Sequence, residues 1–264
     1  MKHYKNRIVL ALSLMVCTAY AQEPTRYFLS VEAGSSFVTG RLNPNWKVRQ
    51  DVGSYEYEYM NANSIHAEMT ISSIGIKPGM SFFGNKVQAY SGLRYTHINS
   101  DLSKNSTLES AFFYLSDHGT TDITDFYKIK HITEDNDYLG VPLEILVLPF
   151  KNDYFDFYLK AGAELNFRFH TSRDIKFLNP DMEPYQDLIL EHANVTTNSI
   201  YASVYSAIGI RLGRKNNVKY DLELLLPSYI LTRNNSSLIL PDFYSGVRFA
   251  VQFPCKKTGT KKAE

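Results

Sequence analysis

Two short stretches of the sequence carry residue types that could do chemistry. In the first, His97 is followed closely by Ser100 and Asp101, and a histidine base that activates a serine is what ester hydrolysis requires. Nothing in the sequence orients these side chains, and serine and aspartate are common where a polar loop begins. We therefore expect His97 to be an ordinary residue near a strand end, and we expect the chain not to be an enzyme.

The second stretch, TEDNDYLG (residues 133–140), has the acidic spacing of a calcium-binding loop. An EF-hand loop that started at Asp135 would have Asp137 in place, but it would have Leu139 where an oxygen ligand belongs and Leu146 where the bidentate glutamate belongs. We expect a solvated acidic loop end instead. The histidines lack metal-ligand spacing and no phosphate-binding glycine loop is present, so the sequence predicts no metal and no cofactor.

Most of the chain follows a strict alternation of apolar and polar residues, which is typical of β-strands with one oily face. In FYLKAGAELNFRF (157–169), the odd positions are Phe, Leu or Ala and the even positions include Lys160, Glu164 and Arg168. Seven further segments alternate in the same way, each about 9–11 residues long, the length that crosses a bilayer at a tilt. The sequence predicts an all-β fold of eight antiparallel strands.

The connections between these segments alternate in length. Short polar turns are expected at Gly84-Asn85, 151–153 and 215–217. Long connections are expected at 39–72, 98–137, 171–199 and 228–243. An even number of strands with short turns at one end and long loops at the other predicts an up-and-down transmembrane β-barrel, with both termini at the short-turn end.

Charged residues fall on one face of the predicted strands. A membrane barrel turns its apolar face to lipid and keeps charges inside, so we expect a lumen charge network. Its members are Glu32, Lys77, Arg94, Glu144, Lys160, Glu164, Arg168, Arg211, Asp221, Glu223 and Arg248. A turn centred on Asn152 places Glu144 directly opposite Lys160, and such bulky, paired side chains would fill the lumen and leave no continuous water path.

A soluble, lipocalin-like barrel with the oily face inside is the alternative. Three features argue against it. The large apolar side chains are too many for an eight-stranded interior, and glycine recurs on the charged face, where crowding is expected. Aromatic residues also cluster at strand ends as membrane girdles do, at Tyr27, Phe82, Phe155, Phe157 and Phe253 on the turn side and Phe37, Tyr95, Phe169 and Tyr201 on the loop side.

The first 21 residues have the pattern of a secretory signal peptide. Lys2, Lys5 and Arg7 precede a short apolar run, and Ala19-Tyr20-Ala21 predicts cleavage between Ala21 and Gln22. A transmembrane anchor is one alternative, but the apolar run is too short for it. A lipoprotein site at Cys17 is another, but the bulky Val16 stands before the cysteine where such sites have a small residue. We expect export, a barrel domain at 22–253 and a short tail at 254–264.

Removing the three basic residues of the predicted signal leaves 25 Lys and Arg (28 − 3) against 27 Asp and Glu, so no basic stripe favours nucleic acid as a partner. A single cysteine, Cys255, remains, which cannot close an internal disulfide. Within the first long connection, SYEYEYM (54–60) alternates again, which fits either a hairpin arm or a tyrosine-rich loop. Tyrosine-rich surfaces make good contacts, so an extracellular or envelope protein would bind through 39–72, 98–137 and 171–199.

The sequence resembles the small outer-membrane β-barrel proteins common in Bacteroidetes, often labelled the porin family, with an OmpX-like barrel domain. The likeness rests on YLGVPLEILV (138–147), FYLKAGAELNF (157–167), GIKPGMSFFGNKVQAYSGLRY (75–95) and YSGVRFAVQF (244–253). It implies insertion into outer-membrane lipid by the barrel-insertion machinery, with Phe253 as the insertion signal. The tail PCKKTGTKKAE beyond Phe253 is a departure, because such clients usually end at the aromatic residue.

The resemblance specifies architecture more than activity. We expect a monomer in the cell outer membrane, with periplasmic termini and a structural or loop-mediated binding role. The alternative is a barrel component of a secretion or transport assembly, and a lipid-modifying enzyme at the rim around His97 is the third hypothesis.

Overall fold

The computed structural model describes residues 26–46, 48–49, 65–104, 112–118, 124–193, 196–214, 217–232 and 235–255. The predicted signal peptide with its cleavage site at Ala21 and Gln22, the SYEYEYM stretch and the tail after Cys255 lie outside these residues.

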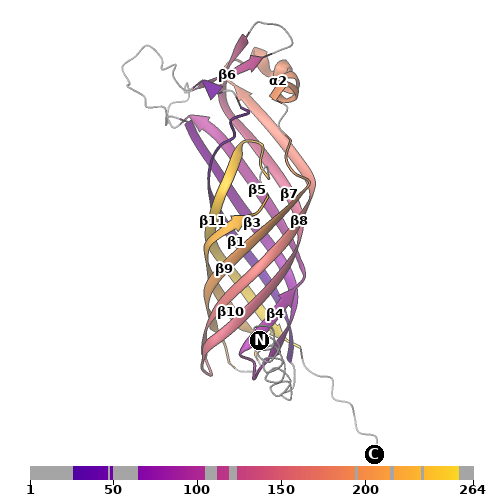
Figure 1. The fold of residues 1–264 in the computed structure, drawn as a ribbon, viewed down its shortest axis with the longest axis vertical. Coiled ribbons are helices and arrows are strands. Elements are labelled where there is room, and N and C mark those ends of the chain that lie inside the picture. Colours follow the sequence, from indigo (N-terminus) through magenta and orange to yellow (C-terminus); the bar gives the residue numbers. More distant parts are fainter. Residues whose placement is uncertain are drawn as a thin grey trace, which may run out of the picture.

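Strands make up nearly all of the regular structure (Figure 1). Their bounds are β1 (Arg26–Leu42), β2 (Val48–Arg49), β3 (Ile65–Phe82), β4 (Val87–Ser91), β5 (Leu93–Lys104), β6 (Phe113–His118), β7 (Thr124–Lys151), β8 (Phe155–Phe177), β9 (Ile200–Leu212), β10 (Lys219–Ile230) and β11 (Ile239–Pro254). Between β8 and β9 lie a 3₁₀ helix, η1 (Pro180–Tyr185), and α2 (Gln186–Ala193). Within the described residues, no helix is long and apolar enough to span a membrane.

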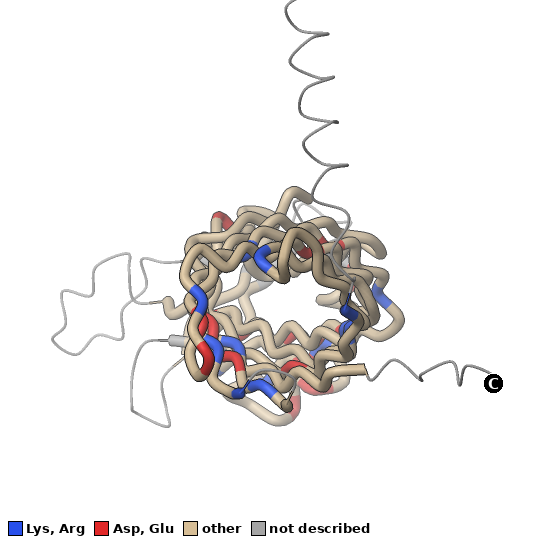
Figure 2. Tube along the Cα trace, turned by 90° about the horizontal axis from the view of Figure 1, so that it is seen from below, with Lys and Arg blue, Asp and Glu red and all other residues tan. Residues whose placement is uncertain are grey.

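The strands pair antiparallel into a sheet that closes on itself, which is visible end-on in Figure 2. The ring runs β1, β3, β4 with β5, β7, β8, β9, β10 and β11, and β11 pairs with β1 again. β4 and β5 share one position, because both pair with β3 and β7 and only Gly92 separates them. The predicted all-β, antiparallel fold is confirmed.

The two ends of the ring differ. The turns that join β3 to β4, β7 to β8 and β9 to β10 lie at one end, together with the start of β1 and the end of β11, and we call this the turn end. Figure 1 shows β6 and α2 at the opposite end, the loop end.

Several strands are longer than the sequence predicted. β7 has 28 residues and β8 has 23, and both continue far towards the loop end. Residues 65–72, 98–104, 124–137 and 171–177 were expected in long connections, but they belong to β3, β5, β7 and β8. The prediction failed for these residues because the apolar face of the strands, which points outward towards the turn end, points inward towards the loop end.

The change of sides is clearest along β7. Towards the turn end, Leu143 and Ile145 point outward and are 62% and 58% exposed, whereas Glu144 between them is buried. Towards the loop end, Ile132 is buried inside and Asp135 lies on the outer face. The same strand therefore has an apolar outer face in one half and a polar outer face in the other.

Glycines on the inner face make room for tyrosine rings. Gly162 lies opposite Tyr205 and Gly209 opposite Tyr158 in the β8–β9 register. A Cβ atom placed on Gly209 would lie 2.3 Å from the Tyr158 ring, and one on Gly162 would lie 2.6 Å from the Tyr205 ring. Contacts this short are not tolerated, so the recurrent glycine on the charged face is a packing requirement.

Gly209→Ala should therefore destabilise the protein by roughly 1–3 kcal/mol, the usual cost of overpacking a filled interior. Ser206→Ala, an outward-facing change on the same strand, should stay within about 0.5 kcal/mol of the wild type. Urea unfolding of the refolded protein in detergent, followed by circular dichroism, measures both. Equal stability of Gly209→Ala and the wild type would contradict this packing.

Candidate functional site

The inner face between the turn end and the middle of the ring carries a charge network built around Glu144 of β7. Its carboxylate lies 2.5 Å from the Lys77 ammonium and 2.8 Å from the Arg94 guanidinium. It also lies 3.4 Å from Lys160 and from Arg248. The Tyr205 hydroxyl donates a further hydrogen bond of 2.6 Å. A single buried carboxylate thus contacts four cations that come from four other strands.

Three more carboxylates complete this network. Glu32 accepts from Arg94 Nε at 2.8 Å and pairs with Lys77. Glu223 pairs with Lys160 and accepts from the Tyr158 hydroxyl at 3.0 Å. The last, Glu164, pairs with Arg94. Four carboxylates therefore face four cations, Lys77, Arg94, Lys160 and Arg248, and the balance allows these groups to be buried together.

A second, smaller cluster lies nearer the turn end. Arg211 donates to both carboxylate oxygens of Asp221, at 2.6 and 2.7 Å, and to Gln88 at 2.7 Å. Arg211 also donates to the Tyr90 hydroxyl at 2.9 Å, and this hydroxyl accepts a second hydrogen bond from Gln252 at 3.2 Å. The sequence placed Arg211 and Asp221 inside the ring, but it did not show that they form a separate pair.

Two predictions about the network need correction. Glu144 lies opposite Gly162, not Lys160, because the β7–β8 turn is later than expected, with Lys151 opposite Asp156 and a register shift after Val147. Since the error is two residues, both side chains keep the inner face and still meet. Arg168, which was assigned to the network, does not join it, and its Nη1 atom is buried without a hydrogen-bond partner among the described residues.

The connection between β10 and β11, which was expected as an outer loop, folds into the ring instead. Asn235, Ser236, Ser237 and Leu238 are fully buried. We call residues 235–238 the plug. Glu134 of β7 accepts a hydrogen bond of 2.7 Å from the Ser237 amide and another from its hydroxyl. The prediction that 228–243 is an exposed loop is therefore wrong for these residues.

The plug is held from several sides. The Ser237 carbonyl accepts from the Trp46 indole at 2.9 Å and from the Asn43 side chain at 3.0 Å. The Asn235 carbonyl accepts from the Tyr138 hydroxyl at 3.1 Å. Around and above it, an apolar core fills the loop end of the ring, including Met69, Ile98, Leu102, Ile129, Ile132, Ile175 and Phe177. The interior is therefore filled by charged groups in one part and by the plug and apolar side chains in the other.

The candidate chemistry at the outer rim is not assembled. His97 faces outward, with Nδ1 2.8 Å from Asp137 and Nε2 3.5 Å from Asp135. Ser100 is fully buried on the inner face of β5, so the serine and the histidine lie on opposite sides of the wall. The pairing of His97 as a base with Ser100 as a nucleophile, which the sequence offered only as a disfavoured alternative, is not formed, because the two positions differ in parity along the strand.

The acidic stretch 133–140 is part of β7 and not a loop end. Glu134 and Asn136 point inward, where they support the plug, and Asp135 and Asp137 point outward. Partial burial raises the pKa of Asp137, but hydrogen bonds from His97 and Tyr95 outweigh it and hold the pKa below its usual value. Asp137 is therefore ionised at neutral pH on the outer wall, two residues before Leu139, where the apolar outer face of β7 begins.

Several of the predicted aromatic girdle residues can be placed. Phe37 and Phe169 are exposed on the outer wall near the loop end, as are Tyr27 and Phe253 at the turn end. Tyr201 was assigned to the loop-side girdle, but it is buried inside, with its ring edge-on to Tyr138 at 4.7 Å between centroids. Its parity matches the inward Ser203 and Tyr205, and this signal was present in the sequence.

Glu144→Gln should destabilise the protein by about 3–5 kcal/mol, because it leaves the surrounding cations without their shared carboxylate. Combining it with Lys77→Met removes one of those cations, so the double variant should be more stable than the sum of the single effects predicts. Lys176→Gln, an exposed change on β8, is the matched control. The unfolding free energies of the wild type, the two single variants and the double variant give the coupling energy between Glu144 and Lys77. Simple additivity of the two single effects would contradict the network.

Glu134→Gln should loosen the plug and shift the fluorescence of Trp46, the only tryptophan, to longer wavelength with stronger acrylamide quenching. The physical reason is that a neutral amide accepts more weakly from Ser237 than a carboxylate does and cannot pair with Arg173. Glu68→Gln, on the exposed outer face at a similar level, should leave the emission unchanged. An unchanged spectrum for Glu134→Gln would show that the plug does not depend on this carboxylate.

No family model matches the sequence, and no curated protein matches it. Among solved structures, the outer membrane protein OprG from Pseudomonas aeruginosa aligns with 86% of this chain and 96% of its own, at 9% identity and a TM-score of 0.35. The translocator domain of the autotransporter NalP from Neisseria meningitidis aligns with 96% and 97%, at 8% identity and a TM-score of 0.29. The transport unit of the autotransporter AIDA-I from Escherichia coli aligns with 94% and 96%, at 8% identity and a TM-score of 0.22. Because the TM-scores are this low, the proposals below rest on the chain's own residues.

Proposed function

We propose that this chain is an integral outer-membrane protein, an eight-stranded transmembrane β-barrel with a closed interior that acts at its outer surface. The observation that carries the proposal is the apolar outer wall. Exposed Leu, Ile, Val, Phe and Tyr side chains occur on β1, β3, β5, β7, β8, β9, β10 and β11. About half of each such side chain, on the order of 100 Å² for an aromatic residue, faces outward, so a handful already exceeds the ~300–600 Å² patch of an ordinary soluble protein.

The height of this wall also suits a bilayer. On β7 the apolar outer face runs from Leu139 to Val147, nine residues. At about 3.3 Å per residue and a tilt of about 40°, these residues rise about 23 Å, close to the ~25 Å apolar band of outer-membrane barrels. Asp137 and His97 lie immediately beyond the belt, where a polar outer face begins.

The interior supports a role other than passive diffusion. The cavity beside Arg94, Glu164 and Arg248 measures about 30 Å³, room for little more than a water molecule. The plug and the apolar core close the loop end. Substances would therefore not pass through the ring, and we place the function at the loop end, as a structural or binding surface.

The loop end offers surfaces for a partner. Phe126, Tyr185 and Leu188 are exposed there, and η1 and α2 stand over the long strands (Figure 1). The ring is complete within one chain, which supports a monomer. The separation of His97 from Ser100 supports a non-enzymatic role.

Purified protein in planar bilayers should show no stable, large conductance. The reason is that the charge network, the plug and the apolar core fill the lumen, and eight strands enclose only enough room for side chains. Single-channel recording measures this, with a 16–18-stranded porin as the positive control. A reproducible open channel that passes small sugars would contradict the closed interior.

The orientation predicts which end faces outward. A membrane-impermeant maleimide applied to intact cells should label Leu188→Cys, which is exposed at the loop end, in a Cys255→Ser background. The native Cys255 is exposed at the turn end and should react only after the outer membrane is permeabilised. Labelling of Cys255 on intact cells, with Leu188→Cys protected, would reverse the orientation.

A further inference from the structure

The guanidinium of Arg168 stands outside the charge balance of the interior. The four cations of the charge network face four carboxylates, Arg211 pairs with Asp221, and Arg173 pairs with Glu134 nearer the loop end. Arg168 makes no ion pair among the described residues, and its Nη1 atom is buried without a hydrogen-bond partner there. A cation on the inner wall is therefore left without an internal carboxylate.

Two side-chain amides at the same level share this property. Asn166 of β8 and Asn235 of the plug are fully buried. Within the described part of the chain, neither the nitrogen nor the oxygen of either amide has a hydrogen-bond partner. Buried polar groups in native proteins are almost always hydrogen-bonded, so a group of them without partners indicates a ligand that completes their bonding. We call Asn166, Arg168 and Asn235 the unpaired cluster.

Tyr138 of β7 connects the members of the unpaired cluster. It lies directly opposite Arg168 in the β7–β8 register, and its hydroxyl donates to the Asn235 carbonyl at 3.1 Å. Its ring packs edge-on against Tyr201, with 4.7 Å between the centroids, and Tyr201 lies opposite Asn166 in the β8–β9 register. A ligand bound by the cluster would thus join the wall of the ring to the plug.

The unpaired cluster is accessible from the loop end. Arg168 is partly exposed, and Thr171, further along β8 towards the loop end, is exposed. The Thr171 hydroxyl donates to the inward Asn136 at 2.6 Å, which places Thr171 on the inner face. Solvent therefore reaches the inner face of β8 beside the plug.

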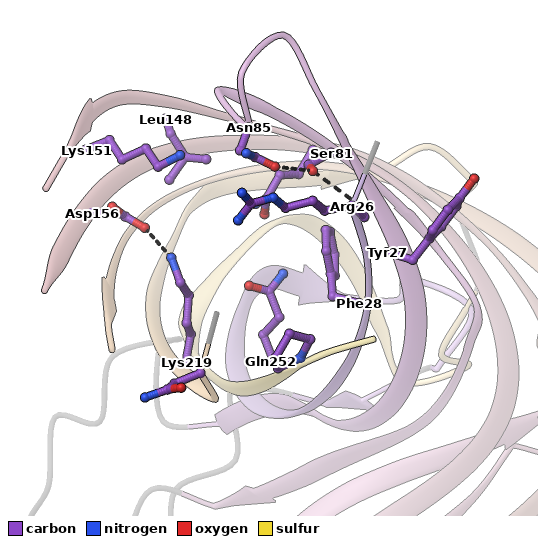
Figure 3. Close-up of a pocket in the computed structure, with 13 residues that line it drawn as sticks. Arg26, Tyr27, Phe28, Ser81, Asn85, Leu148, Lys151, Asp156, Lys219 and Gln252 are labelled. Carbon is purple, nitrogen blue, oxygen red and sulfur yellow. Dashed lines mark hydrogen bonds and ion pairs between the residues drawn. The ribbon is translucent and has the colours of Figure 1, made fainter. Parts of the chain in front are cut away.

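The turn end offers no such access. A cavity of about 80 Å³ opens there, and Figure 3 shows Phe28 on its wall. Phe28 and Leu148 line this cavity and belong to a cluster of buried apolar residues. Tyr158 of the same cluster contacts Glu223 of the charge network at 3.0 Å. The apolar cluster and the charge network both lie between this cavity and Arg168, so a ligand would enter only from the loop end.

The charge and the donors of the unpaired cluster suit a carboxylate. A single guanidinium is neutralised by a monovalent anion, and its planar fork matches the two oxygens of a carboxylate. The amide nitrogens of Asn166 and Asn235 can donate further hydrogen bonds. Partial burial strengthens the attraction, because the effective dielectric constant is lower there than in water.

We propose that the unpaired cluster binds a carboxylate group, with Arg168 as its principal ligand and Asn166 and Asn235 in support. The site rests on the proposed function in one respect, a loop end that faces outward, and it gives that end a ligand chemistry. The carboxylate would come either from a free small organic acid or from the C-terminus of a peptide.

Urea unfolding of the full chain in detergent, at increasing sodium acetate and at equal concentrations of sodium chloride, tests the site. Acetate should raise the unfolding midpoint of the wild type above its value in chloride, since a ligand that binds the folded state stabilises it. Arg168→Gln should weaken acetate binding at least about tenfold, the effect of losing a hydrogen bond to a charged group. Arg168→Lys keeps the charge without the fork and should fall between the two.

The matched control is Lys176→Gln, an exposed change on the same strand, which should respond to acetate as the wild type does. Without acetate, Arg168→Gln should be at least as stable as the wild type, because the guanidinium has no ion pair to lose. Lower stability of Arg168→Gln in chloride would show an internal partner and would overturn the proposal.

The source of the carboxylate is distinguished with triglycine and triglycine amide. Binding of triglycine at least tenfold tighter than acetate, lost in the amide, assigns the site to a peptide C-terminus, and equal binding of acetate and triglycine assigns it to a free acid. Absence of any acetate or triglycine effect, or an equal effect in Arg168→Gln and the wild type, would contradict the site. These measurements in detergent depend on neither membrane orientation nor conductance, so their failure is separate from a failure of the proposed function.

Discussion

The burial of Glu144 among four cations is the interaction on which the rest of the structure depends. A carboxylate in the middle of a narrow ring cannot reach water, and burying it without a partner would cost several kcal/mol of desolvation free energy. It is offset because Lys77, Arg94, Lys160 and Arg248 arrive from β3, β5, β8 and β11. Each of these cations reaches Glu144 only when its own strand is in the correct register. The charge balance of the interior and the closure of the ring therefore depend on the same arrangement of strands.

The alternation of side chains allows a polar interior and an apolar exterior to coexist in one wall. Towards the loop end the side chains still alternate, but the apolar ones now point inward and the polar ones outward. Ile98 and Ile132 point inward and Asp135 points outward. The two halves of the long strands therefore suit two different surroundings. The half with the apolar exterior suits lipid, and the half with the apolar interior suits water.

The sequence was sufficient to predict the parts of the strands that lie towards the turn end. It was insufficient to predict much of the structure towards the loop end. Alternation of apolar and charged residues placed Glu32, Glu144 and Arg248 on the inner face, because a period of two leaves no other choice. The plug could not be predicted, since Asn235, Ser236 and Ser237 have the composition of a solvated loop and are buried only through distant partners such as Glu134 and Trp46.

Local register was also beyond the sequence. The turn between β7 and β8 sits later than its polar residues suggest, and a register shift after Val147 accommodates the difference. Arg168 shows the same limit, because parity placed it inward but could not show whether a carboxylate lies within reach. Parity follows from the backbone alone, whereas partner choice depends on the stagger of neighbouring strands.

The seam between β1 and β11 joins the first and the last described strands of the chain. Before β11 is in place, Glu32, Glu144 and Glu223 lack the cation that all three share, Arg248. A chain that stops short of this strand would have two unpaired edges and an interior with an excess of negative charge. The electrostatics of the interior therefore depend on the presence of β11. Only a chain that includes this strand can close the wall and neutralise the interior in the same step.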